Sequence, residues 1–271
     1  MTPHDNVFHA PSAARRIPSA DTLDTTWQAS AMTLHLRWAA VTDQGRVRNS
    51  NQDAFYAGER LLVVADGMGG MAAGDVASRL AVDAMASLDV AIDNEHQMDA
   101  LHKALEVANG RIAETVAGDA TLQGMGTTMT AVIFSGDRAA LAHVGDSRAY
   151  LLRDGRLNQL TKDDTYVQML VDQGLIRPEE AAGHPRRAVV TQALQGEPVS
   201  PSYVIVEPQA GDRWLLCSDG LTTVVSPESI EETLLTDAAP QECCERLLEL
   251  ALEAGGPDNV TIIVADLTNG D

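Results

Sequence analysis

The stretch that decides the fold covers residues 127–161 and reads TTMTAVIFSGDRAALAHVGDSRAYLLRDGRLNQLT. Four short segments rich in apolar residues alternate here with polar turns, of which Gly136-Asp137 is the first. Strands joined by turns of two to four residues pair antiparallel, because a parallel connection needs a dozen or more residues. We therefore predict consecutive antiparallel strand pairs in this stretch.

Outside this stretch, β-type segments occur in both halves of the chain, at residues 34–41, 53–58, 61–66 and 260–267. We expect the first two to form a pair, because they follow one another closely, with the third beside them. Three longer stretches have helical periodicity instead, at residues 75–88, at residues 99–116 and from Pro240 to the Gly255-Gly256 pair.

The order of these elements indicates the fold class. Antiparallel strands interrupted by two long helices and followed by a late helix favour an α+β layered domain over a parallel doubly wound sheet. Residues 1–34 are rich in small and polar residues without a sustained period, so we expect a flexible N-terminal extension. Residues 35–268 form one predicted domain. Within it, residues 163–201 are the least strand-like part and are predicted to be an inserted helical flap.

The charge of the chain excludes two classes of partner. Its 271 residues carry a formal net charge of -20. Nonspecific binding to nucleic acid and to an anionic membrane surface both need a cationic face, so we expect neither partner. A phosphate site in so acidic a chain needs local cations, which arginine, lysine or metal ions would supply.

The cysteines and the hydropathy pattern indicate a compartment. Three cysteines form no even disulfide framework, and Cys243 and Cys244 are adjacent on a helical pattern, which suits neither a bridge nor a zinc cluster. No run approaches the roughly 20 apolar residues of a membrane span, and we find no pattern of an export signal. We expect a soluble protein in a reducing cytoplasm.

Aspartates recur at the ends of apolar segments. Asp66 follows residues 61–65 and opens a glycine-rich loop, and a lone Asp-Gly of this kind is most often a turn. Asp146 and Asp219 also follow apolar runs, however, and Asp258 precedes one. Four carboxylates that converged without cations would repel one another strongly, so their convergence implies bound metal ions.

The ligand type narrows the choice of metal. No His or Cys pair has the spacing of a tetrahedral zinc site, and oxygen ligands favour Mg²⁺ or Mn²⁺. Two such ions roughly 4 Å apart can hold a bridging hydroxide as nucleophile and polarise a phosphoryl oxygen in the same step. Gly67 adds a backbone carbonyl that a ligand can approach closely, because glycine has no side chain.

A fixed cation for phosphate stands in the segment GRVRNSNQD, residues 45–53. This cation is Arg48, and arginine grips phosphate bidentately. Another acid, Asp53, follows shortly after it. The alternative for Arg48 alone is a solvated charge at a strand edge.

Six motifs in this order, RVRNSNQD, VADGMGG, GMGTT, HVGDSR, LLCSDG and GPDNV, resemble the PPM family of metal-dependent Ser/Thr protein phosphatases, type 2C, in its compact bacterial form. The resemblance covers residues 35–268 and labels residues 163–201 as a mobile flap beside the active site. It implies a four-layer α-β-β-α sandwich with two central antiparallel sheets. The implied activity is hydrolysis of phosphoserine and phosphothreonine in proteins, a phosphoric monoester hydrolysis, opposing a bacterial Ser/Thr kinase.

The resemblance also implies residue roles. Asp66 resembles the acid shared by two Mn²⁺ or Mg²⁺ ions, Gly67 gives its carbonyl to one of them, and Asp219 and Asp258 are similar to ligands of the other. Asp146 resembles the acid that serves, with Asp219, a weaker third ion.

Arg48 matches the phosphate-binding arginine, and Asp53 matches an acid that orients metal-bound water. The implied catalytic set is therefore Arg48, Asp66 and Asp219.

One position departs from the animal members. Met68 stands where they carry a histidine proposed as the general acid, so the group that protonates the leaving oxygen is not identified. His143 lies inside an apolar run and is predicted to be a packed core residue. His184 could reach a substrate or cap a loop, and neither histidine enters the catalytic set.

Two rival functions remain. Gly67, Gly69 and Ala72 satisfy a dinucleotide-binding fingerprint, and Asp89 falls near the ribose-binding distance. Against this, Asp66 would place an unscreened carboxylate beside a pyrophosphate, and the strands pair antiparallel. The other rival is a non-catalytic phosphoprotein-binding module of the same fold. Such a module is expected to have lost an acid or the arginine, whereas all are present.

Overall fold

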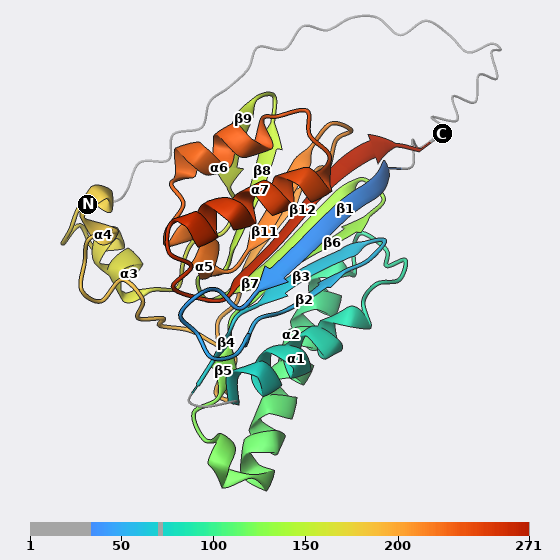
Figure 1. Ribbon diagram of the computed structural model, residues 1–271. Coiled ribbons are helices and arrows are strands. Elements are labelled where there is room, and N and C mark those ends of the chain that lie inside the picture. Colours follow the sequence, from blue (N-terminus) through green and yellow to red (C-terminus); the bar gives the residue numbers. More distant parts are fainter. Residues whose placement is uncertain (1–33, 70–72, 271) are drawn as a thin grey trace, which may run out of the picture. The chain divides into compact units, whose positions relative to one another are not determined.

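The structure is a computed structural model that describes residues 34–69 and 73–270. Two five-stranded antiparallel sheets form its centre (Figure 1). One sheet has the strand order β1-β12-β11-β8-β9, with bounds β1 (Leu34–Asp43), β12 (Val260–Asn269), β11 (Arg213–Cys217), β8 (Arg148–Arg153) and β9 (Arg156–Gln159).

The other sheet has the order β10-β7-β6-β3-β2, with bounds β10 (Ser202–Val206), β7 (Arg138–Val144), β6 (Met129–Ser135), β3 (Leu61–Ala65) and β2 (Ala54–Ala57). A two-stranded ribbon, β4 (Gly67–Met68) and β5 (Gly126–Thr127), extends from it.

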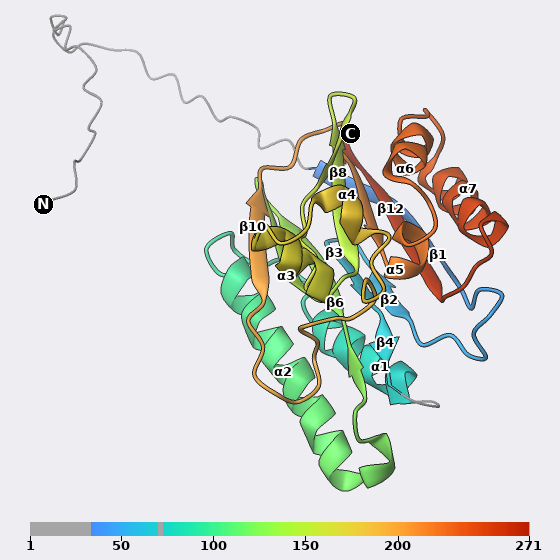
Figure 2. The same ribbon diagram turned by 90° about the vertical axis from the view of Figure 1, so that its left-hand side faces the viewer.

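Helices cover the outer faces of the two sheets (Figures 1 and 2). One face carries α1 (Ala73–Ala86) and α2 (Gln97–Gly118), with the 3₁₀ turn η1 (Ala120–Leu122) after α2, and the other carries α5 (Asp219–Thr222), α6 (Pro227–Leu234) and α7 (Pro240–Glu253). None of the helices in the described part of the chain combines the length and the apolar character needed to cross a membrane.

Three apolar clusters fill the spaces between these layers. The first joins α1 and α2 to the β3-β6-β7 sheet, the second joins α5, α6 and α7 to the other sheet, and the third lies between the two sheets around Trp214. Phe134 packs edge-on against Trp214 in this third cluster, at a centroid distance of 5.2 Å. Three apolar clusters separating four layers confirm the predicted α-β-β-α sandwich.

Local patterns and distant pairings differ in how well the sequence reveals them. The hairpins β6–β7 and β8–β9 pair antiparallel across short turns as predicted. The expected pair between the first two β-type segments does not form, because β1 pairs along its whole length with β12, from Leu34↔Asn269 to Asp43↔Val260. The loop after β1 instead carries the chain to the other sheet, where β2 pairs with β3.

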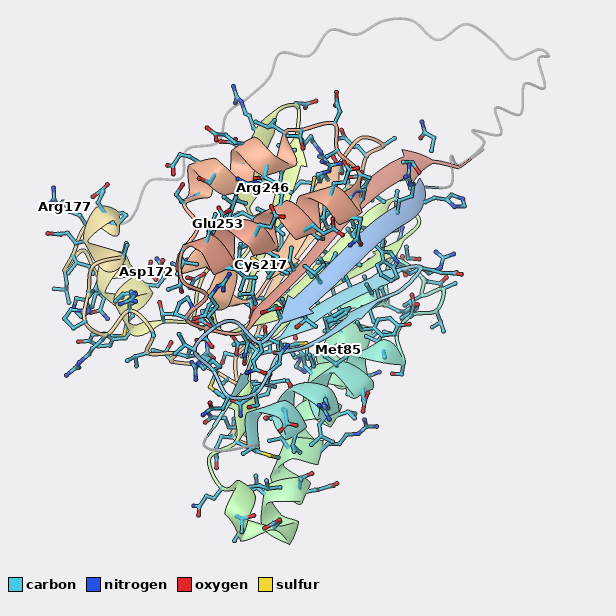
Figure 3. All side chains as sticks on the ribbon, viewed as in Figure 1. Met85, Asp172, Arg177, Cys217, Arg246 and Glu253 are labelled. Carbon is cyan, nitrogen blue, oxygen red and sulfur yellow. The ribbon has the colours of Figure 1, made fainter. Side chains whose placement is uncertain are left out.

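The predicted N-terminal extension lies outside the described residues except for Leu34, which begins β1. The predicted flap, residues 163–201, contains two short helices, α3 (Tyr166–Asp172) and α4 (Pro178–Ala181). These helices lie to the side of the strand layers in Figure 1, and Figure 3 labels Asp172 at the end of α3 and Arg177 directly before α4. All three cysteines are buried and free.

Candidate active site

Asp66 is fixed by the threonines of the GMGTT motif. It directly follows β3, a fully buried strand. Its backbone N–H donates to the Thr128 hydroxyl at 2.9 Å, and its carbonyl accepts from the Thr128 N–H at 2.9 Å and from the Thr127 hydroxyl at 2.9 Å. Because every backbone hydrogen-bonding group of Asp66 is engaged, the position of its carboxyl group is set by a rigid strand end.

The glycine that follows Asp66 is required by packing. A Cβ atom on Gly67 would lie 2.2 Å from the carbonyl oxygen of Gly74 in α1 and 2.4 Å from that of Gln52. No L side chain can be accommodated at such distances, so only glycine lets β4 cross the first turn of α1 at this separation. The crossing holds the Asp66 loop against the helix.

Asp219 is the first residue of α5, and a close backbone approach places it beside the Asp258 turn. A Cβ atom on Gly220 would lie 1.9 Å from the carbonyl oxygen of Asn259. On the other side of the same turn, a Cβ atom on Gly45 would lie 2.2 Å from the carbonyl oxygen of Asp258. Two glycines therefore allow three segments distant in sequence to meet at this point.

The side chain of Asn259 fastens the loop that carries Arg48. Its Nδ2 donates to the carbonyls of Gln44 and Ser50, both at 2.9 Å, and its Oδ1 accepts from the Gln52 N–H at 2.9 Å. Asn259 is only 5% exposed, and its amide makes the hydrogen bonds that the backbone of this loop would otherwise make with water. The sequence prediction did not include Asn259, although the GPDNV motif contains it.

Arg48 and Asp258, predicted as phosphate ligand and metal ligand, contact one another directly. The Arg48 Nη2 donates to the Asp258 Oδ2 at 2.6 Å, and about half of the Arg48 side chain is exposed. Arg48 also lies within electrostatic range of Asp66 and Asp219. Its hydrogen bond with Asp258, opposed by burial, raises the pKa of its guanidinium above the ordinary value. The cation therefore faces three of the four predicted acids.

Asp53 is a buried acid with one oxygen satisfied and one free. Its Oδ2 accepts from the hydroxyls of Ser218 and Thr261, both at 2.7 Å. Its Oδ1 is buried and has no hydrogen-bond partner among the described residues. Burial raises the pKa of Asp53 to about 6, with repulsion from Asp219 adding to the rise and the two hydroxyls opposing it.

Asp146 lies in the loop between β7 and β8 and is 7% exposed. Burial, together with repulsion from Asp219 and Asp163, raises the pKa of its carboxyl group to about 8. The neighbouring Arg148 binds Asp163 through Nε and Nη2, at 2.8 and 2.7 Å. This ion pair ties the start of β8 to the first residue of the predicted flap.

The predicted acids act on one another electrostatically. Burial raises the pKa of Asp66 well above its ordinary value, and Asp53, Asp219, Asp146 and Asp258 add repulsion. Burial and repulsion from Asp258 raise the pKa of Asp219, while a hydrogen bond with Asp66 and attraction to two arginines oppose the rise. The structure thus brings all four strand-end aspartates and Asp53 into one field.

The side chains do not stand in a ready-made metal cluster. Among residues 34–69 and 73–270, no group of three or more His, Cys, Asp or Glu side chains is placed to hold an ion. The donor chemistry nevertheless fits a divalent cation, because the carboxylates are oxygen donors whose mutual repulsion a cation would relieve. The free Asp53 Oδ1 is a buried acceptor that can accept a hydrogen bond from a water molecule.

A pocket of about 510 Å³ opens beside the acids. Asp146, Asp219 and Asp258 line it on the side of the sandwich, and residues of α3 and α4 line it on the side of the flap. Such a volume is typical of ligand pockets, which run from about 300 to 1,000 Å³. The acids therefore lie at the edge of a space large enough for part of a substrate.

The structure shows the hydrogen-bond partners of the two histidines. His143 is buried and bonds to the Thr130 hydroxyl at 2.9 Å and to the Lys162 carbonyl at 3.1 Å, so it is a packed residue as predicted. His184 accepts from the Arg186 N–H at 3.1 Å and therefore caps a loop. Met68 contacts the Gln195 amide through its sulfur.

The dinucleotide-binding interpretation is inconsistent with the fold. The strand before Gly67 lies in an antiparallel sheet, not in a parallel one. Asp89, the candidate ribose ligand, instead accepts hydrogen bonds from the Tyr56 hydroxyl and from the N–H groups of Glu59 and Arg60. Ala72, the third fingerprint position, lies outside the described residues.

Comparisons with known proteins agree with the fold and the motifs. The model of the protein phosphatase 2C family matches residues 44–251. The serine/threonine protein phosphatase PstP of Mycobacterium tuberculosis is 54% identical over 243 residues, which are 89% of this chain and 46% of the relative. Protein phosphatase PhpP of Streptococcus pneumoniae is 35% identical over 240 residues, 85% of this chain and 97% of the relative.

A solved structure shares the fold across the same region. The crystal structure of the catalytic domain of PstP in complex with two manganese ions superposes with a TM-score of 0.82 at 51% identity, covering 88% of this chain and all of that chain. An α-β-β-α sandwich with strand-end aspartates and an arginine at one site defines a class of phosphatase domains. The chain belongs to the protein phosphatase 2C family.

Proposed function

We propose that this chain hydrolyses phosphoserine and phosphothreonine in proteins with the help of Mn²⁺ or Mg²⁺. The observation that carries the proposal is the convergence of Asp66, Asp146, Asp219 and Asp258 in one electrostatic field with Arg48 beside a pocket. Of the relatives named above, PstP is a serine/threonine protein phosphatase and PhpP a protein phosphatase, and the catalytic domain of PstP was crystallised with two manganese ions.

The proposed roles follow the sequence prediction. Asp66 would be shared between two ions, the Gly67 carbonyl would bind one of them, and Asp219 and Asp258 would bind the other. Asp146 would serve a weaker third ion with Asp219. When bound, the ions lower the pKa of a water molecule and withdraw charge from the phosphoryl oxygens.

The remaining roles belong to residues around the acids. Arg48 lies at an exposed edge of the site, where its guanidinium can turn from Asp258 to a phosphate group. A carboxylate offers about four lone-pair sites, so the pairing of Asp258 with Arg48 leaves acceptor capacity for a cation. Asp53 orients water through its free Oδ1. Met68 carries no titratable proton, so the leaving oxygen takes its proton from another group.

The substrates would be phosphoproteins made by a cognate Ser/Thr kinase, in the reducing cytoplasm that the cysteine pattern predicts. The alternative is a non-catalytic module that binds phosphoproteins. The presence of Arg48 and of every predicted acid favours the enzyme, because a binding module does not need a cluster of carboxylates that repel one another.

The test is hydrolysis of p-nitrophenyl phosphate and of a phosphothreonine peptide by the full chain. We expect turnover with Mn²⁺, loss of turnover after chelation and recovery when Mn²⁺ is added back. Calorimetric titration of Mn²⁺ on the same sample controls for metal binding. A protein that binds Mn²⁺ and phosphopeptide without turnover would be the non-catalytic module.

A further inference from the structure

The pocket beside the acids has an apolar wall that phosphate chemistry does not explain. On the flap side, the lining includes five apolar side chains from α3 and from α4 and its C-terminal end, beside the polar Asp163, Thr165, Gln168 and Arg187; the five are Val167, Val171, Pro178, Ala181 and Ala182. Phosphate, metal ions and water all prefer polar surroundings, so these five side chains serve none of the proposed catalytic roles. An apolar surface next to a polar centre instead suits a ligand that has both characters.

The apolar wall is held in place at its base. The Tyr166 N–H donates to the Val189 carbonyl at 2.8 Å, and the Thr191 N–H donates to the Asp164 carbonyl at 2.7 Å. The flap is joined to the sandwich by Asp164, whose N–H donates to the Gly145 carbonyl at 2.7 Å and whose Oδ2 accepts from the Gly145 N–H at 2.9 Å. Gly145 precedes Asp146, so the wall and the acids share one anchor.

The size of the pocket indicates how much of a substrate it holds. At about 510 Å³ it exceeds the needs of a phosphate group and lies in the range of pockets that enclose small organic molecules. Because Asp146, Asp219 and Asp258 line the same pocket, whatever occupies it is continuous with the group that reaches the acids. In a phosphoprotein that occupant is a residue next to the phosphorylated one.

We propose that this pocket is a specificity subsite for an apolar side chain adjacent to the phosphoserine or phosphothreonine of the substrate. The inference rests on the proposed function, since it takes the acids to be the place where the phosphate is cleaved. The apolar side chain packs against α3 and α4 and loses its contact with water, which favours such substrates over those with a polar neighbour.

The experiment compares phosphothreonine peptides of one common sequence that carry Leu or Ser immediately before or after the phosphoresidue. We expect kcat/KM with Mn²⁺ to be about 10-fold higher for Leu than for Ser on one of the two sides, a discrimination typical of apolar pockets. Equal kcat/KM values for all four peptides would overturn the proposal.

A matched pair of variants locates the effect. Val171→Thr replaces a methyl group of the wall by a hydroxyl, and we expect it to reduce the Leu-over-Ser preference about fourfold. Val189→Thr makes the same change in the same flap at a side chain that is 46% exposed and does not line the pocket. If Val189→Thr lowered the preference as much as Val171→Thr, the pocket would not be the subsite.

Failure of the proposed function gives a different result. If the chain hydrolyses neither p-nitrophenyl phosphate nor the phosphothreonine peptides with Mn²⁺, the proposed function fails, and the subsite is then tested by the affinity of the same peptides, measured by fluorescence anisotropy. A Leu-over-Ser preference in affinity that Val171→Thr reduces supports the subsite, whereas equal affinities refute it.

Discussion

At the scale of single residues, the carboxylates of the site repel one another in the folded protein. Repulsion from Asp258 contributes to the raised pKa of Asp219, and repulsion from Asp219 contributes in turn to the raised pKa of Asp66. The sequence identified these acids because each one ends or precedes an apolar strand. It could not identify Asn259, whose amide joins segments more than 200 residues apart. Such hydrogen bonds leave no periodic signal in the sequence.

The substitution Asp219→Asn tests this repulsion between carboxylates. We expect turnover with Mn²⁺ to fall by more than about 100-fold, beyond the 10- to 100-fold that residues orienting a metal's ligands usually cost. The free energy of unfolding of the chelated protein should stay level or rise, because one member of a repulsive cluster becomes neutral. Stopped assays and urea denaturation measure the two effects.

Asp83→Asn is the matched control for this change. Asp83 is exposed on α1, away from the acids, so both turnover and stability should remain as in the parent protein. Substantial turnover in Asp219→Asn, or a loss of stability comparable to a core substitution, would contradict the role assigned to Asp219.

At the scale of elements, the site is built by close contacts between segments that the sequence does not show to be neighbours. The hairpins β6–β7 and β8–β9 were predictable because short turns fix the pairing of adjacent strands. The β1–β12 pair was not, because it joins the two ends of the domain, and no local pattern specifies its partner. The approach of α5 to the Asn259 turn is likewise not specified by any local pattern.

Gly220→Ala tests the approach of α5. The new Cβ atom would lie 1.9 Å from the Asn259 carbonyl oxygen, so the backbone of α5 or of the turn must move. We expect a loss of about 1–3 kcal/mol in the free energy of unfolding, the usual cost of overpacking. Turnover should fall as well, since the movement separates Asp219 from Asp258. Urea denaturation and the p-nitrophenyl phosphate assay measure both.

Gly110→Ala is the matched control and should have the opposite sign. Gly110 lies inside α2, and a Cβ atom there meets nothing within 4 Å. Alanine is favoured over glycine in a helix interior by up to about 1 kcal/mol, so this variant should be stabilised and fully active. Destabilisation by both variants to the same extent would show that the close contact between Gly220 and Asn259 does not cause the loss of stability.

At the scale of the whole molecule, a chain with a net charge of -20 brings several mutually repelling carboxylates together where cations are expected to bind. Asp146 makes this measurable, because burial, aided by Asp219 and Asp163, raises its pKa to about 8. The ordinary pKa of an aspartate is near 4. At a pH between about 4 and 8, Asp146 has therefore lost its proton in the unfolded chain but retains it in the folded protein. The unfolded state binds fewer protons, so stability decreases as the pH rises toward 8 and levels off above it.

The prediction is therefore a decrease in Tm of a few °C for the chelated protein between pH 6.5 and pH 8, equivalent to about 1–2 kcal/mol. The window begins at pH 6.5 because His143, whose pKa burial lowers, has the opposite effect below that pH. Mn²⁺ should raise Tm more at pH 8 than at pH 6.5, because it binds ionised carboxylates and competes with protons. Differential scanning fluorimetry with Asp146→Asn isolates the contribution of Asp146: this variant should lose that part of the decrease in Tm, while Asp66 and Asp219, whose pKa values are also raised, retain the rest. A Tm that rose with pH in the chelated parent protein, or an equal slope in Asp146→Asn, would show that Asp146 does not carry the effect.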